Sequence, residues 1–459
     1  MMQLGAFDQA QQIVMGKSSN AGDGKAVPSG RLARLSKFGA LATTVAGSVV
    51  KNGTKQLVQG KRPKLSDLLL TPKNAMRVAN QLAQLRGAAM KLGQLISMDA
   101  GDILPPQLAD ILARLRSDAH HMPKAQLYQM LSQEWGDNWQ SRVARFDENP
   151  VAAASIGQVH RAISLDGQPL AVKIQYPGVR ESIDSDIDNV ASILRFTGLV
   201  PDTLDIRELL QEAKKQLHEE ADYQREADCL EQFRMAMGDW PHCAIPGIHR
   251  DLSTRRILAM DFVEGEPIES LTTAPQSVRD GVLSTLFTLM FCELFHMRLM
   301  QTDPNFANYL ARPTTQTVVL LDFGATRPFT PELVAGYQAV VAAALAGSRP
   351  GLEAAALQIG YFDDTTQRHH RELVLDLMEL ACEPLCSAEA YDFGQANLAE
   401  RLRDKGLRLA EDWQFWHTPP VDCLFLHRKM GGLFLLATRL KARVNIQRCL
   451  QTAAGVNAP

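Results

Sequence analysis

Three side chains near the middle of the chain have the types and the spacing of a magnesium-binding site. Asp303 and Asn308 lie in the segment QTDPNFANYL, and Asp322 opens an Asp-Phe-Gly triplet after an apolar run. Mg²⁺ prefers hard oxygen ligands, and it usually takes only one or two protein carboxylates beside phosphate oxygens and water. We therefore expect Asn308 and Asp322 to be metal ligands. Asp303 would accept a hydroxyl proton or orient a water.

A β-hairpin must bring these side chains together. Residues 308–310 and 317–321 are typical of strands, and the polar segment 312–315 between them is typical of a turn. Folding of this hairpin would place Asn308 close to Asp322. Protein kinases arrange an aspartate, an asparagine and an Asp-Phe-Gly triplet in this order to hold Mg-ATP.

The composition indicates a globular protein with a large core. The 459 residues are 46% hydrophobic, a length that allows two or three domains, or one bilobal unit with a long extension. The formal net charge of −3 argues against a general nucleic-acid binder. Seven scattered cysteines argue against a secreted disulfide framework. Cys382 and Cys386 lie close together, but no second Cys/His pair has metal-ligand spacing.

No apolar run approaches the roughly 20 residues that a membrane-spanning helix needs. Residues 283–297 are the most apolar stretch, but Glu293 and His296 within it indicate a buried helix of a globular lobe. Residues 1–24 lack the basic and apolar regions of a secretory signal. We therefore expect a cytoplasmic protein without a transmembrane helix.

The amino-terminal region is basic and amphipathic. Residues 24–66 contain nine basic and no acidic side chains, and apolar residues recur at three- and four-residue steps from Leu32 to Val49. Such a helix can lie on an anionic membrane surface, where each nearby cation contributes on the order of 1 kcal/mol. It can equally pack on the body of the protein, and the sequence favours neither alternative.

A lysine on an expected strand would extend the nucleotide site. Residues 152–161 and 169–175 are typical of two strands joined by a turn at Asp166 and Gly167. The second strand carries Leu-Ala-Val-Lys, which ends at Lys173 and matches the kinase strand whose lysine contacts the α and β phosphates. Lysines in apolar surroundings often only extend to solvent. The position upstream of the magnesium set favours a phosphate contact here.

Two further parts of a kinase have candidates in the sequence. A kinase needs a helical glutamate to pair with the strand lysine, and Glu220 and Glu226 are the candidates on a charged helix expected from Arg207 to about Met235. Most acidic helix runs are only solvated faces. Residues 256–265 are typical of a strand that ends in a polar turn, in the position of the hinge that binds adenine.

The longest helix of an all-helical first third is expected at residues 74–98. Lys91 and Gln94 share one face of this helix, while Gly87 and Gly93 leave room for another backbone. These residues alone would make Lys91 a surface lysine.

The chain lacks the glycine-rich loop of protein kinases and has Ala-Ala-Ala-Ser-Ile-Gly at residues 152–157 instead. Together with the segments 91–94, 220–222 and 303–308, this loop resembles the UbiB family of atypical kinase-like proteins, most closely the members that support coenzyme Q (ubiquinone) biosynthesis. The resemblance runs from about residue 27 to residue 443. It implies an α+β, bilobal protein-kinase-like fold, rich in helices, with an N-terminal helical extension that carries the KxGQ motif.

The resemblance implies a role for each matching residue. The catalytic set comprises Asp303, Lys173, Glu226, Lys91, Gln94, Glu220 and Asp222. The nucleotide-binding set comprises Ala152, Ala154, Ser155, Lys173 and the hinge residues Met260, Asp261, Phe262 and Val263. The metal ligands are Asn308 and Asp322. Glu226 matches the partner of Lys173, although the long insertion before the helix leaves Glu220 open as the alternative.

Four parts are expected along the chain. They are a flexible N-terminus (1–27), the helical extension with the amphipathic helix and the KxGQ helix (28–140), a kinase-like N-lobe with a helical insertion (141–264) and a C-lobe (265–459).

Two departures from protein kinases bear on the reaction. Glycine reaches φ > 0 freely, whereas alanine does so at a cost of roughly 1 kcal/mol or more, so the loop with Ala154 should hold the nucleotide in a different pose. Lys91 and Gln94 would occupy the space where a kinase admits a protein substrate. Both departures disfavour phosphorylation of proteins in trans and leave Mg-ATP binding intact.

The leading hypothesis is an atypical kinase-like ATPase, or an unorthodox small-molecule kinase, that binds ATP and Mg²⁺ and supports ubiquinone biosynthesis at a membrane surface. The alternative is a nucleotide-gated scaffold or lipid-extraction factor for quinone-pathway enzymes, without essential phosphotransfer. Expected partners are ATP, quinone-biosynthesis enzymes, isoprenoid quinone precursors and an anionic membrane surface, but no nucleic acid; a homodimer stays open. The expected location is the cytoplasm, peripheral on the inner membrane, or the mitochondrial matrix face in a eukaryote.

Overall fold

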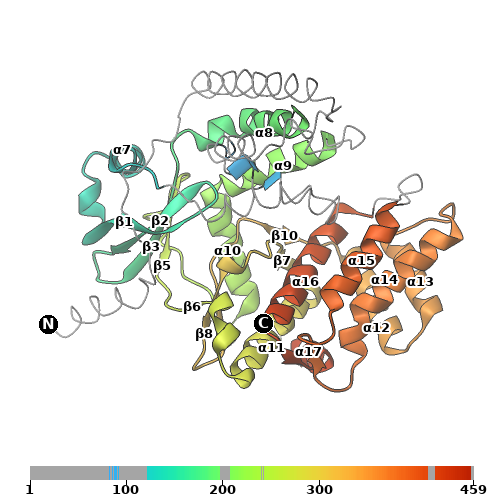
Figure 1. Ribbon diagram of the computed structural model, residues 1–459. Coiled ribbons are helices and arrows are strands. Elements are labelled where there is room, and N and C mark those ends of the chain that lie inside the picture. Colours follow the sequence, from blue (N-terminus) through green and yellow to red (C-terminus); the bar gives the residue numbers. More distant parts are fainter. Residues whose placement is uncertain are drawn as a thin grey trace, which may run out of the picture.

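The structure is a computed structural model of the chain that describes residues 82, 85, 87–89, 91–92, 121–196, 207–238, 240, 242–411 and 419–455. Three predicted features lie outside these residues: the amino-terminal segment 1–27, the basic amphipathic helix of residues 32–49, and Gln94. The described residues form two lobes, a smaller one built on a β-sheet and a larger one built mostly of helices (Figure 1). The α+β, bilobal fold predicted from the sequence is confirmed.

Four antiparallel strands form the sheet of the smaller lobe, in the order β1-β2-β3-β5. Their bounds are Arg145–Ala153 (β1), Gly157–Ile163 (β2), Pro169–Gln175 (β3) and Ile257–Asp261 (β5). The predicted strand at residues 169–175 is confirmed, as is the turn before it, where Gly167 has a φ of 88°. The predicted continuous strand 152–161 is wrong. The chain turns between β1 and β2, where the N–H of Ala154 donates to the carbonyl of Gly157 at 2.8 Å.

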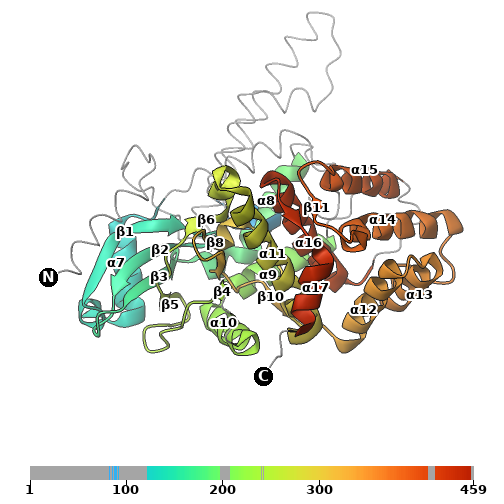
Figure 2. The same cartoon turned by 90° about the horizontal axis from the view of Figure 1, so that it is seen from below.

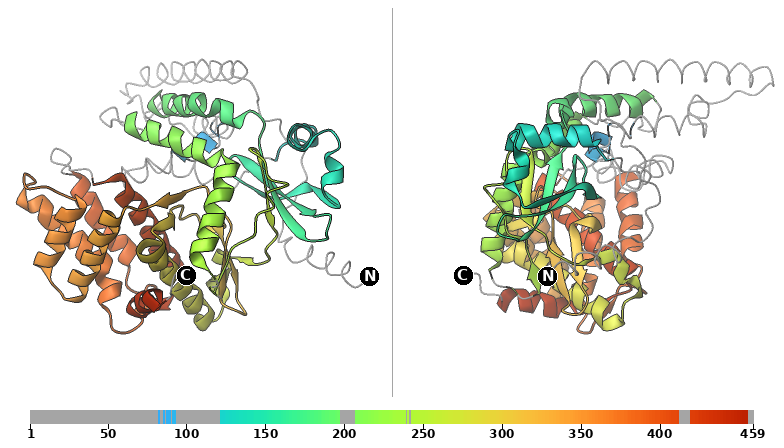
Figure 3. Two further views of the ribbon diagram at one scale, coloured as in Figure 1. Left: turned by 180° about the vertical axis from the view of Figure 1, so that it is seen from behind. Right: turned by 90° about the vertical axis from the view of Figure 1, so that its left-hand side faces the viewer.

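Helices cover both faces of this sheet. Successive residues of β5 point to opposite faces, so Ile257 packs in one apolar cluster and Leu258 in the other. Helix α7 and a short 3-10 helix cover the first face, while α8, α9 and the apolar residues described between positions 82 and 92 cover the second (Figure 3). The bounds of these helices are Lys124–Trp135 (α7), Trp139–Arg142 (the 3-10 helix), Val179–Phe196 (α8) and Arg207–Glu220 (α9).

Helix α10 (Tyr223–Met237) follows α9 after a break, so the single helix predicted from Arg207 to about Met235 is wrong. Asp222 lies at the break with φ −110° and ψ 87°, and its side chain accepts the N–H of Arg225 at 3.2 Å as the N-cap of α10. Asp222 is therefore a cap that precedes the helix carrying Glu226.

Helices α11 to α17 make up most of the larger lobe (Figure 2). Their bounds are Gln276–Cys292 (α11), Pro331–Leu345 (α12), Arg349–Ile359 (α13), Arg368–Cys386 (α14), Leu398–Glu411 (α15), Val421–Arg439 (α16) and Ile446–Gly455 (α17).

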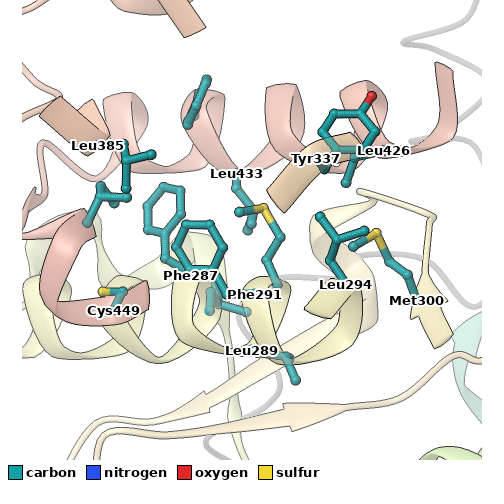
Figure 4. Packing of buried hydrophobic residues seen from close by; sticks show 14 of the residues in the cluster. Phe287, Leu289, Phe291, Leu294, Met300, Tyr337, Leu385, Leu426, Leu433 and Cys449 are labelled. Carbon is teal, nitrogen blue, oxygen red and sulfur yellow. The ribbon is translucent and has the colours of Figure 1, made fainter. Parts of the chain in front are cut away.

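The core of the larger lobe lies around α11, whose last ten residues are nearly all buried, as the apolar run in the sequence predicts. Phe287 and Phe291 of α11 and Leu426 and Leu433 of α16 fill the space between these two helices (Figure 4). A π-helical turn, Glu293–Met297, extends α11. No helix in the described ranges is long and apolar enough to span a bilayer.

Short strands outside the four-stranded sheet of the smaller lobe include the predicted hairpin. One sheet has the order β4-β9-β8-β6, and two further pairs are β7 with β10 and β11 with β12. The bounds are Cys243–Ala244 (β4), Glu266–Pro267 (β6), Leu299–Gln301 (β7), Tyr309–Arg312 (β8), Thr317–Leu320 (β9), Thr326–Pro328 (β10), Tyr391–Asp392 (β11) and Arg443–Val444 (β12). Two 3-10 helices complete the lobe, Ile268–Thr273 and Phe306–Asn308. The antiparallel pairing of β8 with β9 confirms the predicted hairpin.

A buried histidine links the segment before α7 to the sheet. His160 of β2 is fully buried, and its Nδ1 lies 2.8 Å from the carbonyl of Asp147, which can only accept. Its Nε2 therefore accepts from Gln158 Nε2 at 2.8 Å, and Gln158 Oε1 accepts the N–H of Met122 at 2.9 Å. This chain of hydrogen bonds needs a neutral imidazole, and burial lowers the pKa of His160 to about 4.

We predict that His160 makes the protein less stable in acid. The unfolded chain binds a proton below its ordinary pKa of 6.5, whereas the folded chain binds it only near pH 4. The neutral His160 therefore contributes about 3 kcal/mol to the free energy of unfolding. This contribution is fully present above pH 6.5 and is lost as the pH falls through about 4. Measured by urea unfolding between pH 7 and pH 4, the free energy of unfolding should decline less steeply in His160→Gln than in wild type. The exposed His296→Gln is the control; equal slopes for wild type and His160→Gln would contradict the assignment.

Candidate active site

The ammonium of Lys173 on β3 lies between two carboxylates. Its Nζ is 2.9 Å from both carboxylate oxygens of Glu226 on α10 and 3.3 Å from Oδ2 of Asp322. The side chains of Lys173 and Glu226 are 10% and 1% exposed, whereas Asp322 is 33% exposed. The structure thus pairs Lys173 with Glu226 rather than with Glu220.

The pKa values of these groups follow from burial and from their mutual attraction. Burial would lower the pKa of Lys173, but Asp322 and Glu226 raise it well above its usual range. Burial would raise the pKa of Asp322, but Lys173 and the N–H of Gly324 lower it. Burial raises the pKa of Glu226 to about 7 against the attraction of Lys173. Two carboxylates share one ammonium here, and the less exposed of them, Glu226, is the one whose charge is least stabilised.

Helix α10 holds the Asp-Phe-Gly segment as well as Lys173. Arg225 donates to the carbonyl of Gly324 at 2.7 Å and to the carbonyl of Thr326 at 3.1 Å. Phe323 is fully buried and meets Phe233 edge to face, with ring centroids 5.1 Å apart. Contacts from one helix therefore fix the backbone that follows Asp322 and the position of the Phe323 ring.

The β8–β9 hairpin brings the two predicted metal ligands to its open end. Asn308 directly precedes β8, Asp322 follows β9, and the N–H of Leu321 donates to the carbonyl of Asn308 at 3.0 Å. Asp303 lies beside them, since Asn308 Nδ2 donates to its Oδ2 at 3.0 Å. The other oxygen of Asp303 accepts from Arg428 of α16 at 3.1 Å.

The loop between β1 and β2 contacts the insertion and the N-terminal extension. Glu220 accepts from Lys91 Nζ at 2.8 Å and from the hydroxyl of Ser155 at 3.4 Å, so one carboxylate joins three segments. Lys91 is 4% exposed, which differs from the surface position that its sequence context alone suggests. Gly87 allows the close approach, because a Cβ there would lie 3.0 Å from Ile156.

Of the remaining predicted residues, Asp222 and Ala152 have described positions. Asp222 does not contact Lys91 among the described residues; it caps α10 and lies 3.8 Å from Arg180. Ala152 of β1 pairs with Val159. Gln94, the other predicted KxGQ residue, has no described position.

The predicted hinge forms the end of β5 and the residues after it. Met260 is buried in the sheet, and the side chain of Asp261 accepts the N–H of Gly247 at 2.7 Å. The N–H of Phe262 donates to the carbonyl of Pro169 at 2.9 Å. The N–H of Val263 donates to no described residue, which leaves a backbone donor at the expected edge of the nucleotide site.

Comparison with known proteins places this arrangement in a family. A family model described as the ABC1 atypical kinase-like domain matches residues 114–354. The chain is 35% identical over 422 residues to the mitochondrial atypical kinase COQ8 of Saccharomyces cerevisiae, covering 91% of this chain and 84% of the relative. The chain belongs to the ABC1 atypical kinase-like family. The predicted resemblance to atypical kinase-like proteins is thereby confirmed.

A second relative and a solved structure are also similar to this chain. The mitochondrial atypical kinase COQ8B of Rattus norvegicus is 36% identical over 420 residues, covering 91% of this chain and 79% of the relative. The structure of Rv3197 from Mycobacterium tuberculosis, solved in complex with erythromycin, is 25% identical, with a TM-score of 0.56 over 82% of this chain and 95% of that one.

Two contacts of this ABC1 family member have no counterpart in the sequence-based predictions. They are those of Arg225 with the Asp-Phe-Gly backbone and of Arg428 with Asp303. Arg225 and Arg428 do lie in distinctive strings of the sequence, DYQREA and HRKMGG. These strings single out the two residues as candidates for a role in the site. Their contact partners lie about 100 or more positions away in the sequence, so local residue spacing does not predict the contacts.

We predict that Lys173 and Glu226 are strongly coupled in stability. Lys173→Met should destabilise the fold by on the order of 3 kcal/mol, because it leaves a buried carboxylate without its partner. Adding Glu226→Gln should recover part of the loss, since the unpaired charge is then removed. Guanidinium unfolding of the two single variants and the double variant measures the coupling.

The control for this cycle is a surface pair. Arg401 and Glu383 lie 2.6 Å apart with side chains 45% and 37% exposed, so Arg401→Met should cost less than about 1 kcal/mol. Additive effects of Lys173→Met and Glu226→Gln would show that the buried pair is not an energetic unit.

Proposed function

We propose that the protein is an atypical kinase-like ATPase that binds Mg-ATP and supports ubiquinone biosynthesis at a membrane surface. The observation that carries this proposal is the cluster of Lys173, Glu226 and Asp322 at the open end of the hairpin that also positions Asn308. Lys173 keeps a positive charge for phosphate oxygens, and Asp322 keeps a negative charge for a cation. The acceptor of the phosphoryl group is water in this proposal.

The donor set fits a magnesium ion. Asn308 Nδ2 donates to Asp303, so its Oδ1 is the amide atom left for a cation, and it has no hydrogen-bond partner among the described residues. Asp322 adds a carboxylate at the same end of the hairpin. In the described part of the chain no three His, Cys, Asp or Glu side chains gather as a metal site. A bound Mg²⁺ would neutralise phosphate charge, with phosphate oxygens and water as its remaining ligands.

The residues around this pair would hold the rest of the nucleotide. Lys173 would contact the α and β phosphates, with Glu226 fixing its position. Ala154 and Ser155 form the turn above the phosphates, with Ala152 beside it. The hinge residues 260–263 would bind the adenine edge, and the unused N–H of Val263 supports this placement.

The N-terminal extension would keep protein substrates out. The Lys91–Glu220–Ser155 contacts tie the extension to the nucleotide loop and the insertion, in the region where protein kinases admit a peptide. Gln94 and Asp222 belong to this closure in the proposal. The division into residues 1–27, 28–140, 141–264 and 265–459 is proposed with it, although α7 packs on the sheet of the N-lobe.

The family supports the proposed pathway and location. The relatives in yeast and rat are named as mitochondrial COQ8 atypical kinases, and the sequence most closely resembles members that act in coenzyme Q biosynthesis. We therefore propose quinone-pathway enzymes, isoprenoid quinone precursors and an anionic membrane as partners. The basic segment 24–66 would provide the membrane contact.

We predict that Mg-ATP stabilises the protein and that Asp322→Asn abolishes this effect. A ligand at 100 times its Kd adds about 2.7 kcal/mol to the free energy of unfolding, which raises the melting temperature. Differential scanning calorimetry with and without Mg-ATP measures it. The exposed Asp404→Asn is the matched control and should respond as wild type does. A wild type that does not respond to Mg-ATP would sink the enzymatic proposal.

Turnover separates the ATPase from a nucleotide-gated scaffold. Phosphate release should rise with anionic liposomes or phenolic quinone precursors and should be lost in Asp303→Asn. Nucleotide binding without any turnover under these conditions would favour the scaffold.

Normal isoprenoid quinone levels in a strain that lacks the gene would remove the pathway assignment.

We predict that Ala154→Gly strengthens ATP binding. Residues 152–157 make their turn without any positive φ, and glycine would let backbone N–H groups reach the phosphates through conformations that alanine disfavours. Isothermal titration with Mg-ATP measures the change in Kd. The exposed Ala144→Gly controls for the greater freedom of glycine in the unfolded chain. An unchanged Kd would count against the role of the alanine loop.

A further inference from the structure

The segment with residues 301–308, called here the QTD loop, is held by helix α16. Lys429 of α16 donates to the carbonyl of Gln301 at 2.8 Å and lies 3.2 Å from Glu293, which belongs to the π-helical turn after α11. Both charged side chains are almost completely buried, at 1% and 0% exposure. A buried, paired cation of this kind has little freedom to move, so it fixes the start of the loop relative to α16.

A glycine lets α16 approach the middle of the same loop. A Cβ on Gly432 would lie 2.3 Å from the Cβ of Pro304, closer than real Cβ atoms come to other atoms. Gly432 therefore leaves the space that Pro304 fills. Together with the Lys429 contact, this sets the distance between α16 and the loop at two points, independently of any nucleotide.

Arg428 reaches the loop at a third point and acts on Asp303. Its Nη2 lies 3.1 Å from Asp303 Oδ1, and the two side chains are 10% and 17% exposed. The second oxygen of Asp303 accepts from Asn308 Nδ2 at 3.0 Å. An ionised carboxylate can only accept, so it selects the NH₂ side of the Asn308 amide. The planar amide then turns its Oδ1 away from Asp303.

We propose that Arg428 is a positioning residue of the metal site, which acts through Asp303 to orient the amide oxygen of Asn308 toward the cation. The inference rests on the proposed function, because it concerns the same Mg-nucleotide site. Arg428 does not touch the cation itself. Its guanidinium fixes the rotation of the Asp303 carboxylate, and the carboxylate fixes which face of the amide is presented. Groups that orient a metal ligand in this way commonly affect metal affinity strongly.

The test compares metal binding with nucleotide binding in full-length Arg428→Met. Mn²⁺ is titrated into protein with saturating ADP and followed by electron paramagnetic resonance, and ADP binding is measured separately in EDTA. We expect the Kd for Mn²⁺ to rise about tenfold or more, in the range known for groups that orient metal ligands, while the Kd for metal-free ADP changes less than about twofold. Equal Mn²⁺ affinity in wild type and variant would overturn the proposal.

Two further variants keep the test decisive. Arg439→Met removes a cation from the same helix, but one that is exposed and paired with Glu269, and it should bind Mn²⁺ as wild type does. Arg428→Lys keeps the charge and most of the packing, so it provides a folded variant for the test if Arg428→Met fails to fold. It should still weaken Mn²⁺ binding, because a single ammonium does not fix the carboxylate as a planar guanidinium does.

The outcomes separate the two proposals. A wild type without Mn²⁺-dependent ADP binding overturns the proposed function itself. A wild type that binds both, with Arg428→Lys and Arg428→Met equal to it, overturns the role of Arg428 alone. Parallel losses of Mn²⁺ and metal-free ADP affinity in both variants also overturn it, since they indicate general damage to the site.

Discussion

The site depends on one buried ammonium group. Lys173 belongs to the sheet of the smaller lobe, Glu226 to α10, and Asp322 to the segment that follows the hairpin of the larger lobe. Removing any of these three charges from water is unfavourable unless the others are present, so each element is constrained by the position of the other two. The ammonium of Lys173 thus makes the relative position of the two lobes depend on the charges of Glu226 and Asp322.

Helix α10 converts this electrostatic requirement into a rigid arrangement. Three of its side chains act on the segment around Asp322: Arg225 holds backbone carbonyls, Glu226 holds the shared lysine, and Phe233 packs against Phe323. The helix itself is fixed at its start by the Asp222 cap. A rotation of α10 would therefore break polar and apolar contacts together, which favours a single well-defined geometry over a series of intermediate ones.

The sequence predicts the parts of the site that are local and leaves the long-range ones open. The hairpin, the strand with Lys173 and the strand before the hinge each follow from a short apolar run with turn residues a few positions away. The sequence does not reveal the break at Asp222, because no glycine or proline marks it; an aspartate ends one helix and starts the next through a side-chain hydrogen bond. The sequence leaves the partner of Lys173 open for the same reason, since the break sends Glu220 toward Lys91 and Glu226 toward Lys173. The contacts of Arg225 and Arg428 depend on the packing of distant elements.

The shared carboxylate of Glu220 couples the conformational equilibrium of the extension to that of the loop between β1 and β2. Its two oxygens bind the extension through Lys91 and the loop through Ser155, so a change that strengthens one contact alters the geometry available to the other. By linkage, a ligand that favours one arrangement of the loop shifts the equilibrium of the extension by the same free energy, and the reverse holds as well. In the proposed function, a surface that draws the extension away would therefore be sensed at the phosphates, without any contact between that surface and the nucleotide.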